Sequence, residues 1–282
     1  MRLPPPSSRR QVLTAATALL LARPGPPHPA LAAGATSAAL LELIPAMPFG
    51  APATNATLPP PLVAKIEALA TTLEAEFAGR DVVTRDQNLN GSWRLLYSDG
   101  REITSLAKGF PGGFQLGPTY QPLDLATGRF ENQGSVINRY GIARLSTNVV
   151  GDLRPAPAGS LNAVGVRNDR GNRVDVEFRR ITFSLDEVGG RAVSLRKVLV
   201  PNQVEGVAQP ANDVTYLDAT TRVTRGGDGA LFVFRREESD RPLLSAAERA
   251  ALYAGEGVAV TTGTGRAEDS APAELKRLLR EP

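Results

Sequence analysis

Short runs of alternating apolar and polar residues fill most of the chain between residues 91 and 237, separated by turns rich in glycine, proline and aspartate. Alternation with a period of two indicates β-strands that bury one face. The runs that we expect to be strands are 91–97, 119–125, 130–138, 142–150, 161–166, 174–185, 192–200 and two runs of a hairpin over 213–237. About nine strands at such short spacing favour an antiparallel barrel. In the run 174–185 the apolar phase changes, which predicts a β-bulge near Arg179 and Arg180.

The hairpin carries the strongest local signal. Residues 213–225 and 230–237 flank the turn sequence Gly226-Gly-Asp-Gly229, and both runs are rich in residues that favour strands. The stretch Leu231-Phe232-Val233-Phe234 is apolar on both faces, so this strand should lie deep in the sheet.

A glycine-rich segment, 99–118, interrupts the strands. Four glycines between Gly109 and Gly117 lead us to expect no regular element here. The apolar side chains of Phe110, Phe114 and Leu116 could form a portal or lid that meets lipid. The alternative is a loop that folds across the end of the barrel and buries these side chains.

Helical periodicity appears on both sides of the strands. An apolar face recurs at intervals of three and four residues in Leu62, Ile66, Leu69, Leu73 and Phe77. This spacing predicts a helix, which we expect to cover one end of the barrel. Ser245 and Glu248 form a capping-box pattern that predicts a short helix to Tyr253, and residues 273–280 have an amphipathic pattern.

The N-terminal region has the composition of a targeting segment. Residues 1–32 hold four arginines and no acidic residue, and the uncharged run 11–22 follows the pair Arg9-Arg10. With Ala30-Leu31-Ala32 at its end, this order predicts an export signal that resembles a twin-arginine signal. An N-terminal anchor or a segment without fixed structure is the alternative.

Residues 33–61 are rich in alanine and proline, which predicts an extended linker. Its apolar stretch 40–47 either touches a membrane or packs back on the domain.

Charge and side-chain chemistry exclude several classes of function. Without residues 1–32, the balance of 32 basic to 29 acidic residues becomes 28 to 29, so the net charge of +3 becomes −1 and gives no argument for nucleic-acid binding. Cysteine is absent and the single histidine, His28, lies in the expected signal. Thiolate or histidine metal sites and histidine-based triads are therefore excluded from the remainder, and we expect no metal and no cofactor.

Two motifs resemble those of a known family, the plastid lipid-associated proteins or fibrillins (PAP/fibrillin). The first is Leu89-Asn-Gly-x-Trp-x-Leu-x-Tyr97, and the second runs from Tyr216-Leu-Asp218 through two arginines and two glycines to Val233. The resemblance covers residues 62–238. It implies a mainly β fold, a lipocalin-like antiparallel β-barrel with a preceding helix and a partly helical C-terminal tail, here 239–282.

The resemblance also suggests roles for individual residues. It gives a structural role to Gly91, Trp93, Tyr97, Arg222, Arg225, Gly226, Gly229 and Phe232. Trp93 is expected at the closed end of the barrel beneath the side chain of Arg222 or Arg225. The candidate ligand-binding residues are Asp218, Tyr216, Phe110, Phe114 and Leu116. Asp218 would orient the polar head of an amphiphile at the cavity mouth, or it forms an ion pair with one of the two arginines.

By this resemblance the protein is expected to bind, or associate with, hydrophobic plastid molecules such as carotenoids, quinones and fatty acyl lipids, without catalysis. We expect peripheral membrane association, no nucleic-acid partner, and a place in the chloroplast thylakoid lumen, or alternatively in the stroma or on plastoglobules. Two alternatives are an enzyme that acts on a lipid or isoprenoid substrate and a structural coat protein of lipid globules.

Overall fold

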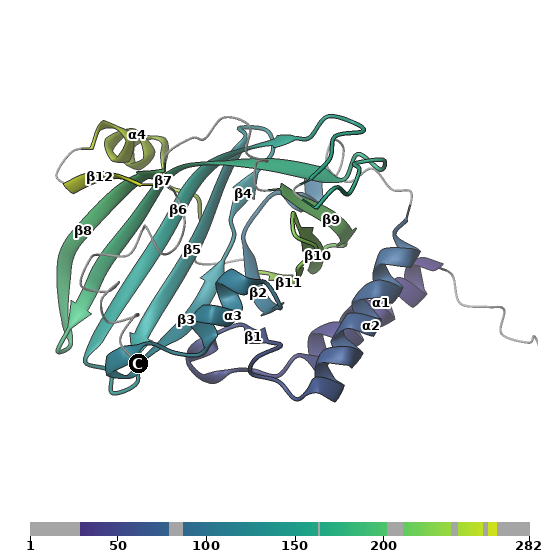
Figure 1. Ribbon diagram of the computed structural model, residues 1–282, viewed down its shortest axis with the longest axis horizontal. Coiled ribbons are helices and arrows are strands. Elements are labelled where there is room, and N and C mark those ends of the chain that lie inside the picture. The colour runs from purple at the N-terminus through teal and green to yellow at the C-terminus, as the bar shows by residue number, and fades with distance from the viewer. Residues whose placement is uncertain are drawn as a thin grey trace, which may run out of the picture.

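One sheet dominates the structure, a computed structural model that describes residues 29–78, 87–162, 164–201, 211–237, 242–255 and 259–263 (Figure 1). In this part of the chain twelve strands share the sheet, and eight of them close into an antiparallel barrel. The barrel strands are β2 (Trp93–Ser98), β3 (Phe114–Tyr120), β5 (Arg129–Asn138), β6 (Ala143–Pro155), β7 (Arg173–Val188), β9 (Ala211–Leu217), β10 (Thr221–Gly226) and β11 (Leu231–Arg236). The fold class that the sequence predicts is confirmed.

The barrel closes through β7, which is long enough to pair with two strands along one edge. Its start, Arg173–Asp175, pairs with β9, and its end, 181–188, pairs with β8 (Arg191–Pro201). Val150 of β6 faces Arg180 while Gly151 faces Phe178, so Arg179 is the extra residue of a β-bulge. This confirms the predicted bulge and explains how both apolar phases of β7 face the same side of the sheet.

Two seams in the barrel wall are much narrower than the other pairings. The seam between β7 and β9 holds three residue pairs, and that between β2 and β3 holds a single pair, Arg94 with Tyr120. By contrast, β6 pairs with β7 over thirteen positions.

Short strands extend the barrel at its edges. β12 (Ala259–Gly263) adds to β8 and β1 (Ala53–Thr54) adds to β2, both in parallel, whereas β4 (Leu123–Asp124) pairs with β5 in antiparallel. The sequence predicted neither parallel pairing.

Three expectations about the strand region are wrong. The hairpin predicted across Gly226–Gly229 does form between β10 and β11, but its first run is not one strand, because a turn after Leu217 divides 213–225 into β9 and β10. Residues 161–166 contribute only an isolated bridge to Arg167. The segment 99–118 contains the helix α3 (Arg101–Ala107) and the start of β3, so its glycines do not exclude regular structure.

Two helices precede the barrel strands. α1 (Pro29–Leu43) and α2 (Pro60–Glu76) pack against each other, and α2 confirms the helix predicted from its apolar face. The prediction of an extended linker is wrong where α1 lies, because Leu40 is fully buried in the main core. Residues 1–28, which hold most of the expected signal, lie outside the described residues.

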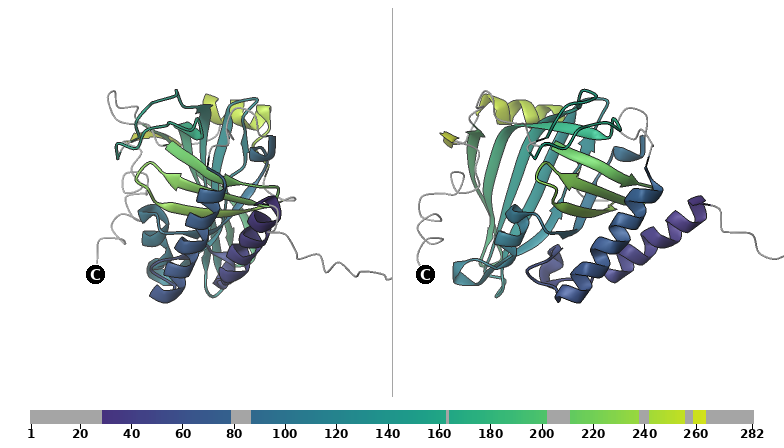
Figure 2. Two further views of the ribbon diagram at one scale, coloured as in Figure 1. Left: turned by 90° about the vertical axis from the view of Figure 1, so that its right-hand side faces the viewer. Right: turned by 45° about the vertical axis from the view of Figure 1, so that its right-hand side comes forward.

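The helix pair covers a wall of the barrel and not one of its ends, which corrects the expectation for α2. On β10, Arg222 and Thr224 point into the barrel, so Val223 between them points outward, where it joins Ile66 and Leu73 in the core. The ring of Phe77, just after α2, meets the ring of Tyr216 edge-on at 5.4 Å. Figure 2 shows both helices alongside the small strands β9–β11.

On the opposite side of the molecule lies α4 (Ala246–Ala254), which begins with the predicted capping box: Ser245 Oγ accepts from Glu248 N, and the Glu248 carboxylate accepts from Ser245 N. Three short 3-10 turns complete the described elements, at Pro48–Gly50, Gln87–Leu89 and Pro111–Gly113. None of the described helices combines the length and apolarity that crossing a membrane requires.

Candidate functional site

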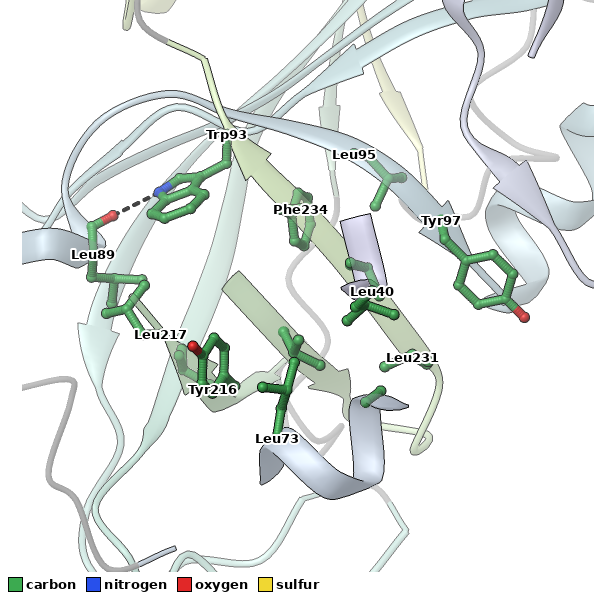
Figure 3. Packing of buried hydrophobic residues seen from close by; sticks show 14 of the residues in the cluster. Leu40, Leu73, Leu89, Trp93, Leu95, Tyr97, Tyr216, Leu217, Leu231 and Phe234 are labelled. Atoms are coloured by element: carbon green, nitrogen blue, oxygen red, sulfur yellow. Dashed lines mark hydrogen bonds between the residues drawn. The ribbon is translucent and has the colours of Figure 1, made fainter. Parts of the chain in front are cut away.

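Side chains close one end of the barrel around Trp93. The indole is fully buried, and its Nε1 donates a 2.9 Å hydrogen bond to the Leu89 carbonyl (Figure 3). The guanidinium of Arg222 lies 5.1 Å from the centre of the Trp93 ring and 4.0 Å from that of Phe234, and Arg236 lies 4.3 Å from the indole. Two cations over one indole form an arrangement that stabilises the closed end through cation–π attraction.

Arg222 is a buried cation with a neutral partner. Its side chain is 1% exposed and donates to the amide oxygen of Gln121, while its Nε has no partner within the described residues. Burial, with a smaller contribution from Arg236, lowers the pKa of Arg222 to about 9, which leaves it charged at neutral pH. The remaining gap beside it measures only about 10 Å³, so the closed end is filled by protein and has no room for an organic ligand.

Arg225 lies on the other face of the same strand. It forms ion pairs of 2.6 and 2.8 Å with Glu67 and Glu74 of α2, and these hydrogen bonds raise its pKa despite partial burial. The structure thus assigns the position above Trp93 to Arg222, while Arg225 fastens the helix to the outer wall.

Tyr216 and Asp218 lie together, but under α1 and not at a cavity mouth. The Asp218 carboxylate accepts from Tyr216 Oη at 2.6 Å, from Ser37 Oγ at 2.8 Å, and from the backbone N–H groups of Thr220 and Thr221 at 2.7 Å each. Burial opposes ionisation, but these hydrogen bonds outweigh it and lower the pKa of Asp218. Burial and the neighbouring carboxylate raise the pKa of Tyr216.

The ion pair expected for Asp218 is therefore wrong. Both arginines of the closing motif have other partners, and the Asp218 acceptors serve to build the β9–β10 turn and to fix α1 upon it. We assign Tyr216 and Asp218 a structural role.

Phe110, Phe114 and Leu116 lie at the other end of the barrel. The C-terminal end of β3 lies by Trp93, because Gln121, just after the strand, donates from its N–H to the Trp93 carbonyl. Phe114, at the N-terminal end of β3, pairs with Asn138 at the opposite end of the barrel. The two phenylalanines are half-buried and joined by a 2.9 Å hydrogen bond from Phe110 N to the Phe114 carbonyl, and Leu116 is buried. Three strands separate β3 from β9, so the structure does not bring the two sets of candidate residues together.

The other motif residues support this frame. Gly91 has a φ of 119°, which only glycine adopts easily, and it exchanges backbone hydrogen bonds with Leu123. Gly226 and Gly229 shape the β10–β11 turn, Tyr97 is buried, and Phe232 stacks on Phe234 at 6.3 Å. Burial raises the pKa of Tyr97 to about 12.

The inward face of the wall beyond the closed end is mostly apolar. Register places Val149, Ile181 and Phe183 on the same face as Phe130 and Leu153, which contribute to the packed closed end. Leu145 and Leu185 continue this row toward the open end, with Asn132, Thr147 and Lys197 as polar members. Apart from Ile181, these side chains are only half-buried, in contrast to the sealed closed end. The sequence signal for this row was the alternation of apolar residues along β7, which keeps to one face once the bulge at Arg179 is taken into account.

A polar groove of about 490 Å³ lies on the outward face of the same strands. Hydroxyl and amide side chains of Gln133, Ser146 and Thr182 line it, together with Arg196 and with Glu248 of α4. Its outward position follows from Val150 and Val198, which pack on Leu252 of α4. Within the described residues no cluster of His, Cys, Asp or Glu has the makings of a metal site.

Comparison with known proteins agrees with this architecture. The model of the PAP_fibrillin family matches residues 35–235, most of the chain and all of the barrel strands except the last residue of β11. The chain belongs to the PAP/fibrillin family. A relative from Arabidopsis thaliana, plastid-lipid-associated protein 6, chloroplastic, is 27% identical over 192 residues. The match covers 61% of this chain and 63% of that relative, so the chain spans less than two thirds of its length. No solved structure matches.

Sequence reasoning missed several residues that hold the PAP/fibrillin barrel together. Gln121 and Arg236 lie outside the closing motif, which runs from Tyr216 to Val233. Gln121 accepts a hydrogen bond from Arg222, and Arg236 lies over the Trp93 ring. Ser37 lies in the segment expected to be a linker, and no sequence pattern linked it to Asp218.

Proposed function

We propose that the barrel binds the apolar chain of a lipid or isoprenoid along its inward row, without catalysis. The observation that carries this proposal is the contrast between the two ends: the closed end is packed around Trp93, whereas the row from Val149 to Leu185, apart from Ile181, stays half-buried. Half-buried apolar side chains on an inward face gain free energy when a ligand covers them.

The size of that gain favours modest affinity. Covering roughly 300 Å² of apolar surface contributes about 7 kcal/mol before the cost of association is subtracted. Carotenoids, quinones and fatty acyl chains all offer such a surface. The name of the Arabidopsis relative supports a plastid lipid and a chloroplast location. The arginine pair before residue 11 favours the thylakoid lumen, with the stroma or plastoglobules as alternatives.

The test is lipid extraction from natively purified protein, followed by mass spectrometry. We expect one class of apolar molecule at a fixed ratio to the protein, and Phe183→Asn should reduce that ratio severalfold. The matched control is Ser184→Asn, which changes the next residue of β7 on the outward face. Protein that carries no lipid, or equal loss in both variants, would refute binding along the inward row. A lipid-free barrel that still coats lipid globules would favour the coat protein, and turnover of a carotenoid or acyl substrate would favour the enzyme.

A further inference from the structure

Three loops meet at the open end of the barrel and form one connected edge. We call this edge the rim, and it consists of residues 108–114, 139–142 and 188–191. Arg139 N donates to the Gly113 carbonyl at 2.9 Å, and Gly189 N donates to the Ile142 carbonyl at 2.8 Å. These hydrogen bonds join the loop before β3, the β5–β6 turn and the β7–β8 turn.

The rim exposes large apolar side chains. Tyr140 is 66% exposed, Ile142 56% and Val188 45%, and the rim also contains the half-buried Phe110 and Phe114. Single exposed apolar residues are common on protein surfaces, but three of them on one hydrogen-bonded edge form a patch that favours an apolar partner.

Cations accompany these side chains. Lys108, Arg139 and Arg191 are exposed, and the three rim loops contain no acidic residue. Just outside them, Glu187 occupies the position that faces Arg144, and Asp186 accepts a hydrogen bond from Ser146 Oγ. The Arg139 guanidinium lies 4.6 Å from the centre of the Tyr140 ring. An aromatic ring beside cations suits the boundary of a bilayer, where the ring enters the interface and the cations meet anionic headgroups.

We propose that the rim docks the mouth of the barrel on a bilayer surface that carries anionic headgroups. In this orientation the inward row opens toward the acyl chains. Docking itself needs no ligand in the barrel, so it stands apart from the proposed function and is measured separately.

The experiment is cosedimentation of the full-length protein with vesicles of phosphatidylcholine, with and without phosphatidylglycerol. We expect binding only to the anionic vesicles, with affinity that falls as salt rises. One cation near an anionic surface contributes about fivefold in affinity, so Arg139→Glu with Arg191→Glu should weaken binding at least tenfold. Tyr140→Ser with Ile142→Ser should weaken it to a similar extent.

Matched controls lie on the loop between β6 and β7, at the closed end. Leu161 and Val164 there are 64% and 54% exposed, so Leu161→Ser with Val164→Ser removes two apolar side chains that are exposed to a similar fraction. Arg154→Glu with Arg167→Glu reverses as much charge. All variants should keep the parent's melting temperature within a few degrees, since every substituted side chain is exposed.

Rim variants that bind anionic vesicles like the parent would overturn the proposal, as would controls that lose as much affinity, or parent protein that does not sediment with anionic vesicles. Loss of extracted lipid in Phe183→Asn with unchanged vesicle binding supports separate roles for wall and rim. If the protein fails to bind vesicles but still carries extracted lipid, only the rim proposal is refuted. If it binds vesicles but carries no extracted lipid, only the proposed function is refuted.

Discussion

Replacing Trp93 with alanine should destabilise the protein by about 3–5 kcal/mol. The ring is fully buried, and an aromatic side chain of this kind removes roughly 150–250 Å² from water, which corresponds to about 4–6 kcal/mol at 25 cal/mol per Å². The substitution also removes the 2.9 Å hydrogen bond to Leu89 and one aromatic face from the buried Arg222. Partial collapse of the cavity recovers some of this energy, which brings the expectation back to the stated range.

The assay is urea denaturation followed by far-ultraviolet circular dichroism. Trp93 is the single tryptophan of the chain, so fluorescence would lose its reporter in the same substitution. Because domains of this kind are stable by about 5–15 kcal/mol, the variant should remain folded in water with a much lower midpoint.

Trp93→Phe is the control, because it keeps an aromatic face and loses the hydrogen bond. It should cost about 1–2 kcal/mol from the unpaired Leu89 carbonyl and the smaller ring. A midpoint of Trp93→Ala within error of the parent would show that the barrel does not close over the indole. Equal losses in the two variants would contradict the area argument and place the energy in the hydrogen bond.

Three further outcomes are expected. The leader should be cleaved near Ala32, as N-terminal sequencing of protein from fractionated cells would show, and an intact 1–32 segment in the stroma or cytosol would contradict this. Replacing both Phe110 and Phe114 with serine should weaken liposome or carotenoid binding tenfold or more while the melting temperature barely moves; a large loss of stability with unchanged binding would end the portal idea. Asp218→Asn should destabilise at neutral pH and matter less in acid, because a depressed carboxyl pKa contributes stability above its unfolded value of about 3.9 and loses it as pH falls through the folded value. Unfolding curves of both proteins at several pH values check this, and a pH-independent difference would argue against it.

Local patterns predicted the elements that local forces determine. The bulge at Arg179, the face of α2 and the capping box at Ser245 each depend on neighbours in sequence. Gly117 shows why the start of β3 was missed: a side chain there would collide with Ser135 Oγ, so this glycine permits close approach inside a strand and does not end it. The turn at Asp218 had a signal in its short polar residues, since the carboxylate accepts from two following backbone N–H groups.

The candidate site depended on contacts distant in sequence. Asp218 could be placed near arginines by motif alone, yet burial under α1 gave it Ser37 as a partner across 181 positions. The rim likewise joins three loops whose sequences share no pattern, and the pairing of β3 with β5 and of β6 with β7 brings them together.

The two narrow seams divide the barrel into two leaves. One leaf is β3, β5, β6 and β7, and the other is β9, β10, β11 and β2. Among the described residues, the named strands pair across the two seams at four positions, and the bridge between Gly91 and Leu123 and the hydrogen bond from Gln121 N to the Trp93 carbonyl add to them. Side chains also join the two leaves: Arg173 forms an ion pair with Asp213 across one seam, and Arg222 donates a hydrogen bond to Gln121 across the other. The two leaves are therefore joined mainly at the end of the barrel that holds Trp93. For the ligand binding proposed above, the consequence is that a change in the angle between the leaves would adapt the barrel to ligands of different width and leave the long ladders within each leaf intact.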